Sequence, residues 1–241
     1  MDPRIDKITK GLKDFFDQAG FKKAVVGLSG GVDSALVAKF GVLALGKEHV
    51  TALIMPHDDI NLASSLPDAI AWAEELGIEY RVVSVRDYVE RYKKLPWDET
   101  ELAHMNIQAR VRMTILYHYA NSNNALVLGT GNKTEKMLGY FTKYGDGGVD
   151  VLPIGDLYKT EVWKISDELG LPKAIIKKTA SAELKAGHTD EGEIGMSYAE
   201  IDEILKKFES GGVAETENEK KLMRRIEVNR HKGELPPVIE A

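Results

Sequence analysis

The stretch Ala24–Phe40, AVVGLSGGVDSALVAKF, joins an apolar run to an amphipathic one through a glycine pair that has a serine on each side and an aspartate inside. The β-branched residues before Gly27 predict a strand, and the periodic residues after Val32 predict a helix. Glycines at such a junction let a ligand approach bare backbone, and the N–H groups of a helix start form an anion site. A tight turn capped by Ser29 or Asp33 would explain the same residues without a ligand.

Short β-branched runs alternate with longer helical patterns along the first half of the chain. This alternation predicts one α/β domain over residues 1–241, built on a parallel sheet with helices on both faces. Ligands of such sheets bind beyond the carboxyl ends of the strands. The predicted strands are AVVGL (24–28), VTALIM (50–55), YRVVSV (80–85) and ALVLGT (125–130).

The alternation weakens after residue 150. The pattern of residues 158–171 predicts a helix, residues 179–195 are expected to form a polar loop, and residues 197–210 and 218–231 predict two closing helices. No internal repeat or domain linker is evident.

The composition excludes several classes of function. The chain has 241 residues, a formal net charge of -6 and no cysteine. Thiolate metal sites, disulfides and cysteine nucleophiles are therefore absent, and no broad basic surface is available for a nucleic acid. The first twenty residues form a charged amphipathic helix pattern, and no apolar run reaches membrane-spanning length. We expect a cytoplasmic protein with no nucleic-acid or membrane partner.

A Walker-type phosphate loop does not fit the opening stretch, because no lysine follows its glycines. Residues 41–48, GVLALGKE, nearly match the Walker pattern, but Glu48 stands where a metal-binding hydroxyl is required. These residues are expected to end a helix.

The segment Ser29–Ser34, SGGVDS, resembles the pyrophosphatase loop of the N-type ATP pyrophosphatases. That resemblance implies cleavage of ATP between its α and β phosphates, with AMP used to activate a carboxylate or amide oxygen. It leaves open ammonia ligases for NAD, GMP or asparagine, a citrulline ligase, tRNA thiolases and lysidine synthases. The thiolases generally depend on cysteines and basic surfaces, so the composition argues against them.

A second segment, LGTGNKTEKMLGYFTKYGDGGVDVLPIGDLYKTEV (128–162), resembles the NAD synthetases along nearly its whole length, and residues 106–117, 177–184 and 229–237 agree. The resemblance implies a Rossmann-like, adenine nucleotide alpha hydrolase-like fold. It also implies a C–N ligase of the ammonia-dependent type, which joins ATP, nicotinic acid adenine dinucleotide (deamido-NAD) and ammonia into NAD, AMP and pyrophosphate. This is the last step of NAD biosynthesis.

The same resemblance implies that Asp33 and Glu135 are Mg²⁺ ligands and that Lys159 joins them as a catalytic residue. Hard oxygen ligands, few in number, suit Mg²⁺ bridged by phosphates. Taken singly, Asp33 would be a helix-dipole carboxylate and Lys159 a surface lysine. The implied ATP contacts are Gly27, Leu28, Ser29, Gly30, Gly31, Val32, Asp33, Ser34, Thr130, Lys159 and Ser181.

For deamido-NAD, the resemblance assigns one helical arginine and a set of residues in the second segment and near the C-terminus. The glycines of KYGDGG (143–148) would let a loop close over the nicotinate, on which an aromatic ring would stack. The residues so assigned are Arg110, Phe141, Lys143, Asp150, His231 and Lys232.

Ammonia is the expected nitrogen donor, because glutamine users in the family carry an added amidase domain with a catalytic cysteine. The resemblance also implies a homodimer, and residues 106–120 offer an apolar helix face for a two-fold contact. Two alternatives stay open: a nucleotide-binding regulator without turnover, and a synthetase subunit for another acid that needs an amidotransferase partner.

Overall fold

The computed structural model describes residues 2–57, 65–181 and 189–239. Within these ranges, four strands form one parallel sheet in the order β3-β2-β1-β4. The strands are β1 (Lys23–Gly27), β2 (Val50–Ile54), β3 (Glu79–Val82) and β4 (Ala125–Leu128). All four lie within one residue of the predicted starts, but β3 ends at Val82 because Val85 already precedes a helix.

Side-chain alternation along β1 explains why the sheet is covered on both faces. Ala24 and Val26 enter one apolar core, whereas Val25 between them enters another. Successive strand residues point to opposite faces, so a run that is apolar at every position needs cover on both sides. The prediction of a single α/β domain with helices on both faces is confirmed.

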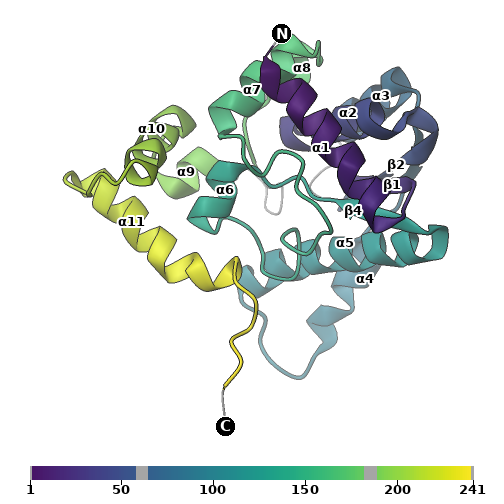
Figure 1. Cartoon of the computed structure of the whole chain (residues 1–241). Helices are drawn as coiled ribbons and strands as arrows, with labels where there is room; N and C mark the ends of the chain where they lie inside the picture. The colour runs from purple at the N-terminus through teal and green to yellow at the C-terminus, as the bar shows by residue number, and fades with distance from the viewer. Residues whose placement is uncertain (1, 58–64, 182–188, 240–241) are drawn as a thin grey trace.

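The first core lies between the sheet and helices α1, α2, α3, α7 and α8, and the second between the sheet and α4 and α5. Figure 1 shows α1 and α2 side by side over the sheet. The helix bounds are α1 (Pro3–Ala19), α2 (Val32–Leu45), α3 (Leu66–Leu76), α4 (Arg86–Glu90), α5 (Glu101–Asn123), α7 (Lys159–Glu168) and α8 (Lys173–Ile176).

A third apolar core joins α6 and α7 to the C-terminal helices, which group to one side of the sheet (Figure 1). These helices are α6 (Lys133–Leu138), α9 (Asp190–Ile194), α10 (Tyr198–Glu209) and α11 (Glu217–Asn229). The expected loop over residues 179–195 is wrong in part, because Thr189 caps the short helix α9 through the N–H of Gly192. Residues 182–188 of that expected loop lie outside the described residues.

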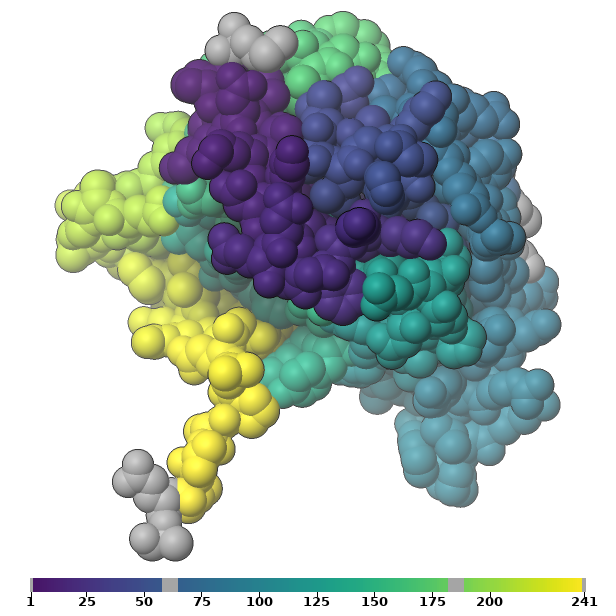
Figure 2. Space-filling model, turned by 45° about the vertical axis from the view of Figure 1, so that its right-hand side comes forward, coloured from purple at the N-terminus to yellow at the C-terminus, as the bar shows by residue number. Residues whose placement is uncertain are grey.

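The described residues also include three single-turn 3₁₀ helices: η1 (Lys47–His49), η2 (Tyr92–Lys94) and η3 (Arg230–Lys232). Beyond η3, the chain projects from the body of the molecule (Figure 2), and Leu235 is 90% exposed. No described helix is both long enough and apolar enough to cross a membrane.

Candidate active site

The serines of the glycine-rich turn between β1 and α2 stabilise its backbone by hydrogen bonds. Ser34 Oγ accepts a hydrogen bond from the Ser29 N–H at 3.1 Å and donates to the Gly31 carbonyl at 3.0 Å. Gly31 is the N-cap of α2 and supplies no capping side chain. Because the first turn of a helix has N–H groups without partners in the helix, this start is suited to bind an anion.

Gly30 could not be replaced without moving a neighbouring segment. Its φ is +85°, and a Cβ atom there would lie 2.4 Å from the Ser65 carbonyl oxygen. The left-handed conformation and the close backbone contact both require glycine. Glycine at position 30 therefore allows the turn to pass directly against the Ser65 backbone.

Asp33, Glu135 and Lys159 meet at the carboxyl end of the sheet, although they come from α2, α6 and α7. The Nζ atom of Lys159 forms an ion pair with Asp33 and lies 3.9 Å from Glu135 Oε1. Lys159 is only 2% exposed. This centre was predicted from the resemblance, and the fold brings its members into contact.

Asn132 connects the two carboxylates of this centre. Its Nδ2 atom donates to Asp33 Oδ1 at 2.9 Å. Its own side-chain oxygen caps α6 by accepting from the Glu135 N–H, and the Glu135 carboxylate in turn accepts from the Asn132 N–H. Asn132 was not predicted, although Asn-Lys-Thr-Glu in the loop that follows β4 has the spacing of a capping box.

The pKa of Glu135 shows that the positive charge of Lys159 does not fully compensate two neighbouring carboxylates. Burial, and then the charge of Asp33, raise the pKa of Glu135 to about 8, although Lys159 opposes the shift. Burial disfavours the charged form of Lys159, but Asp33 and Glu135 outweigh it and raise the pKa of the lysine. One lysine thus serves two carboxylates, an arrangement that a divalent cation would stabilise further.

Within the described residues, no cluster of three or more His, Cys, Asp or Glu side chains could hold a metal ion. Asp33 and Glu135 are two hard oxygen donors, so a metal there would need further oxygens from a ligand and water. Mg²⁺ has this preference, since it is commonly held by one or two carboxylates together with phosphates. The residues present fit that ion.

Two tyrosines and an aspartate beside the lysine were not predicted. The ring of Tyr198 lies 5.3 Å from Lys159 Nζ, and its hydroxyl donates to Asp190 Oδ2 at 2.9 Å. Tyr140 donates to Asp190 and Glu193. Burial, followed by nearby carboxylates, raises the pKa of both tyrosines above the usual range, so both hydroxyls remain donors. In the sequence, Tyr198 has only the pattern of a core residue.

The centre opens into a cleft of about 400 Å³ that runs between the glycine-rich turn, α5 and the segment 139–149. The apolar side chains Leu102, Met105, Ala109, Met113 and Leu116 line it from one face of α5. This face belongs in part to the surface expected for a two-fold contact. Predicted site residues that line the cleft are Gly27, Leu28, Ser29, Gly31, Val32, Asp33, Ser34, Thr130, Glu135, Phe141, Lys159, Ser181 and Lys232.

Lys232 lines the cleft beside Gly139 and Phe141. Its Nζ atom donates to the carbonyls of Gly139 and Phe141 at 2.8 and 3.2 Å. Burial, and then repulsion from Arg225, lower the pKa of Lys232. Arg225 also lines the cleft and lies over the Tyr140 ring at 5.1 Å. Two adjacent cations here provide a place for a second anionic group of a ligand.

The remaining predicted residues lie outside the cleft lining. Arg110 donates to the Lys143 carbonyl at 3.3 Å, and Lys143 Nζ donates to the His231 carbonyl at 2.5 Å, so these three form a linked group. Asp150 lies apart, because it accepts from the Val127 N–H at 2.7 Å and from the Tyr117 hydroxyl at 3.1 Å. Gly30 packs against Ser65.

Known proteins resemble this chain over nearly its whole length. The family model described as NAD synthase matches residues 4–236. The NH(3)-dependent NAD(+) synthetase of Archaeoglobus fulgidus is 49% identical over 97% of this chain and 95% of its own length, and that of Methanosarcina mazei is 46% identical over 98% and 96%.

Solved structures also match. The NMN synthetase from Francisella tularensis has a TM-score of 0.91 and 34% identity, and the alignment covers 99% of this chain and 98% of that one. The NH3-dependent NAD synthetase from Campylobacter jejuni has a TM-score of 0.86 and 33% identity and covers both chains completely. Full-length matches of this kind show the family: the chain belongs to the NAD synthases.

Proposed function

We propose that the protein amidates deamido-NAD with ammonia at the expense of ATP and forms NAD, AMP and pyrophosphate. The observation that carries the proposal is the Asp33–Lys159–Glu135 centre at the mouth of the glycine-rich turn, inside one cleft. Both curated relatives above carry the name NH(3)-dependent NAD(+) synthetase, which agrees with the ammonia-dependent formation of NAD.

The chemistry needs both an anion-binding turn and positive charge. A nicotinate carboxylate is a poor acceptor for ammonia, so one of its oxygens first attacks the α-phosphorus of ATP and pyrophosphate leaves. In this proposal, the N–H groups at the start of α2 and the ammonium of Lys159 neutralise the charge that develops on the phosphates, since both lie in the cleft. Ammonia then attacks the activated carbonyl carbon, loses a proton, and AMP leaves with the former carboxylate oxygen.

In this proposal, Asp33 and Glu135 hold Mg²⁺, which supplies charge neutralisation at the phosphate oxygens when it is bound. Thr130 and Ser181 contribute further contacts to ATP. The aromatic ring of Phe141 is the proposed stacking surface for nicotinate, since it lies in the cleft and Gly147 leaves room for it: a Cβ there would be 2.6 Å from the ring.

The rest of deamido-NAD is proposed to extend past Lys232 toward Arg110, Lys143 and His231. Asp150 is the weakest member of this set, since its carboxylate is already occupied by Val127 and Tyr117. We also propose a cytoplasmic homodimer. The dimer is supported by the position of several proposed dinucleotide-binding residues outside the cleft, where a second subunit could complete their site.

The direct test incubates the protein with ATP, Mg²⁺, ammonium and deamido-NAD, followed by detection of NAD by mass. Nicotinic acid mononucleotide should be assayed as an alternative acceptor in place of deamido-NAD, because one structural relative is named an NMN synthetase. A panel of other acids tests the alternative that the chain is a synthetase subunit for a different substrate. Measuring pyrophosphate tests the alternative of a nucleotide-binding regulator, because such a protein would bind ATP and release no pyrophosphate.

A further inference from the structure

A buried carboxylate behind the active centre has no place in the reaction described above. Asp202, on α10, is fully buried, as is Thr134 on α6. Among the described residues, no lysine, arginine or histidine forms an ion pair with Asp202. A buried carboxylate without a cation is costly unless hydrogen bonds compensate it.

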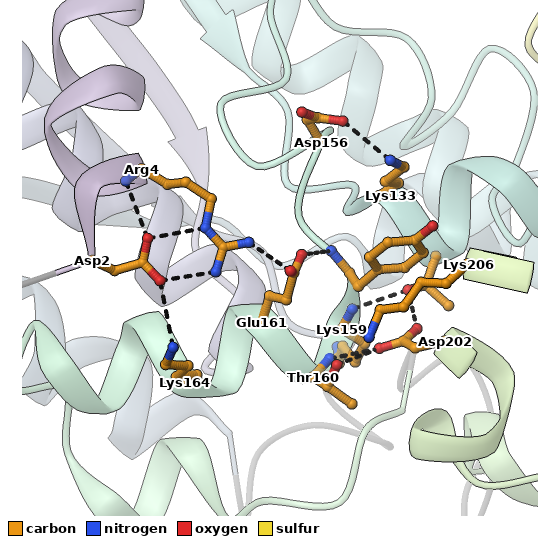
Figure 3. A network of polar contacts seen from close by, with 12 residues as sticks. Asp2, Arg4, Lys133, Asp156, Lys159, Thr160, Glu161, Lys164, Asp202 and Lys206 are labelled. Atoms are coloured by element: carbon orange, nitrogen blue, oxygen red, sulfur yellow. Dashed lines mark hydrogen bonds and ion pairs between the residues drawn. The ribbon is translucent and has the colours of Figure 1, made fainter. Parts of the chain in front are cut away.

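Hydrogen bonds to Asp202 come from the starts of two helices. Its Oδ1 atom accepts from the Thr134 hydroxyl at 2.5 Å. Its Oδ2 atom accepts from the N–H and the hydroxyl of Thr160 at 2.8 and 2.7 Å. Figure 3 shows Asp202 beside Thr160 and Lys159 at the start of α7. A carboxylate at this position is also favoured by the dipole of α7.

These contacts fix the backbone on both sides of the active-site lysine. The Lys159 N–H donates to the Thr134 hydroxyl at 2.9 Å, and the same hydroxyl donates to Asp202. The next N–H, that of Thr160, donates directly to Asp202. Asp202 therefore holds one of the two peptide units that flank the Lys159 Cα directly and the other through the Thr134 hydroxyl, which sets the direction in which the lysine leaves the helix.

The second helix start carries Glu135. Thr134 directly precedes Glu135, so Asp202 links the α6 turn that holds the carboxylate to the α7 turn that holds the lysine. Tyr198 lies one turn before Asp202 on α10, and its ring lies against Lys159 Nζ. The helix α10 thus holds the residues next to the base of the lysine through Asp202 and lies near its charged end through Tyr198.

We propose that Asp202 is a positioning residue, which aligns Lys159 and Glu135 for adenylyl transfer by clamping the starts of α6 and α7. This inference rests on the proposed function, because it assigns no contact between Asp202 and a substrate. Small displacements of groups that stabilise a transition state reduce turnover more than they reduce ground-state binding.

The test compares Asp202→Asn with Glu203→Gln. The neighbouring carboxylate of Glu203 is 77% exposed, so its variant makes the same change of charge without touching the clamp. In Asp202→Asn, one acceptor becomes an N–H donor, so either Thr134 or Thr160 loses its partner. We expect kcat to fall by about tenfold or more, with the KM values for ATP and deamido-NAD within about threefold. Glu203→Gln should keep normal kinetics.

A second pair of variants separates the clamp from a general loss of stability. Thr134→Ser keeps the bridging hydroxyl, whereas Thr134→Val keeps the shape and removes it. We expect the serine variant to retain most of kcat and the valine variant to lose as much as Asp202→Asn. This pair decides the question if Asp202→Asn does not fold.

All assays are run well below the measured Tm of each variant. A kcat within about twofold of wild type for Asp202→Asn overturns the proposal, as does an equal loss for Thr134→Ser and Thr134→Val. Failure of the proposed function is a separate result, because the wild-type protein would then form no amidated nucleotide at all.

Discussion

Lys159 forms an ion pair with Asp33 across 126 positions of sequence, and the pair is part of the wall of the cleft. Glu135, the second carboxylate near the lysine, lies on a third helix. The sheet makes this possible, because β1 and β4 are adjacent and parallel and their carboxyl ends deliver α2 and α6 to one place. The reactive groups are thus assembled by topology.

Replacing either carboxylate of the centre should abolish most turnover and leave the fold intact. Asp33→Asn and Glu135→Gln are expected to lose about a hundredfold in rate, because one lost transition-state contact costs about 3 kcal/mol. The Tm should hold, since burial already disfavours the charged form of Glu135 and glutamine can still accept from the Asn132 N–H. Initial rates across a Mg²⁺ series and calorimetry measure the two effects.

The matched control is Asp156→Asn, whose side chain is 94% exposed. It should keep both rate and Tm. Near-normal rates for both centre variants at limiting Mg²⁺ would show that the metal assignment is wrong.

Variants of the two substrate regions should separate kinetically. Lys159→Ala should impair ATP use with every acceptor, whereas Lys143→Ala should mainly raise the KM for deamido-NAD. Asp150→Ala should in addition lower stability by about 1 kcal/mol, because it leaves the Val127 N–H without its side-chain acceptor. Steady-state kinetics with each substrate varied measure the first two effects, and Tm measures the third. Equal losses in ATP binding for all three variants would contradict the division into an ATP region and a deamido-NAD region.

Ammonia alone should supply the nitrogen. Transfer from glutamine needs a nucleophile that forms a glutamyl enzyme, and the chain has no cysteine. Activity should rise with pH, because ammonium has no free lone pair and ammonia does. Purified protein given amide-labelled glutamine without ammonium should yield no labelled NAD, and sustained incorporation in the absence of a contaminating glutaminase is the contrary result.

Acid should weaken the C-terminal helices through Glu219. Hydrogen bonds from Lys207 and from the N–H groups at the start of α11 lower the pKa of this carboxyl to about 2. Its stabilising effect is complete above its unfolded pKa, about 4.3, and is lost as the pH falls toward 2. Glu219→Gln should therefore show a flatter loss of stability over that window in denaturant titrations. A slope identical to that of wild type would exclude this role.

Sedimentation should show a dimer at concentrations at which the protein is active. The α5 face that was expected to form the contact lies in part along the cleft, so dimerisation and substrate binding should be coupled. Deamido-NAD should then shift the equilibrium toward the dimer. A fully active monomer would remove this proposal.

The strands and the glycine-rich turn could be predicted from sequence, because their causes are local. β-Branched runs favour strands wherever they lie, and the positive φ of Gly30 needs glycine whatever surrounds it. The resemblance supplied the Asp33, Glu135 and Lys159 set. Taken one at a time, each of these residues would have been assigned to a helix end or a solvated surface.

Tertiary structure decided what depends on contacts between distant segments. Asp202 stands among Tyr198, Ile201 and Leu205 on the buried stripe of α10, and only the packing of α10 against two other helix starts gives its carboxylate partners. The resemblance assigns Asp150 to the substrate, and only the fold shows that its carboxylate also accepts from a backbone N–H of β4. Local sequence determines backbone conformation over a few residues, whereas the partner of a buried polar group is set by where the chain returns.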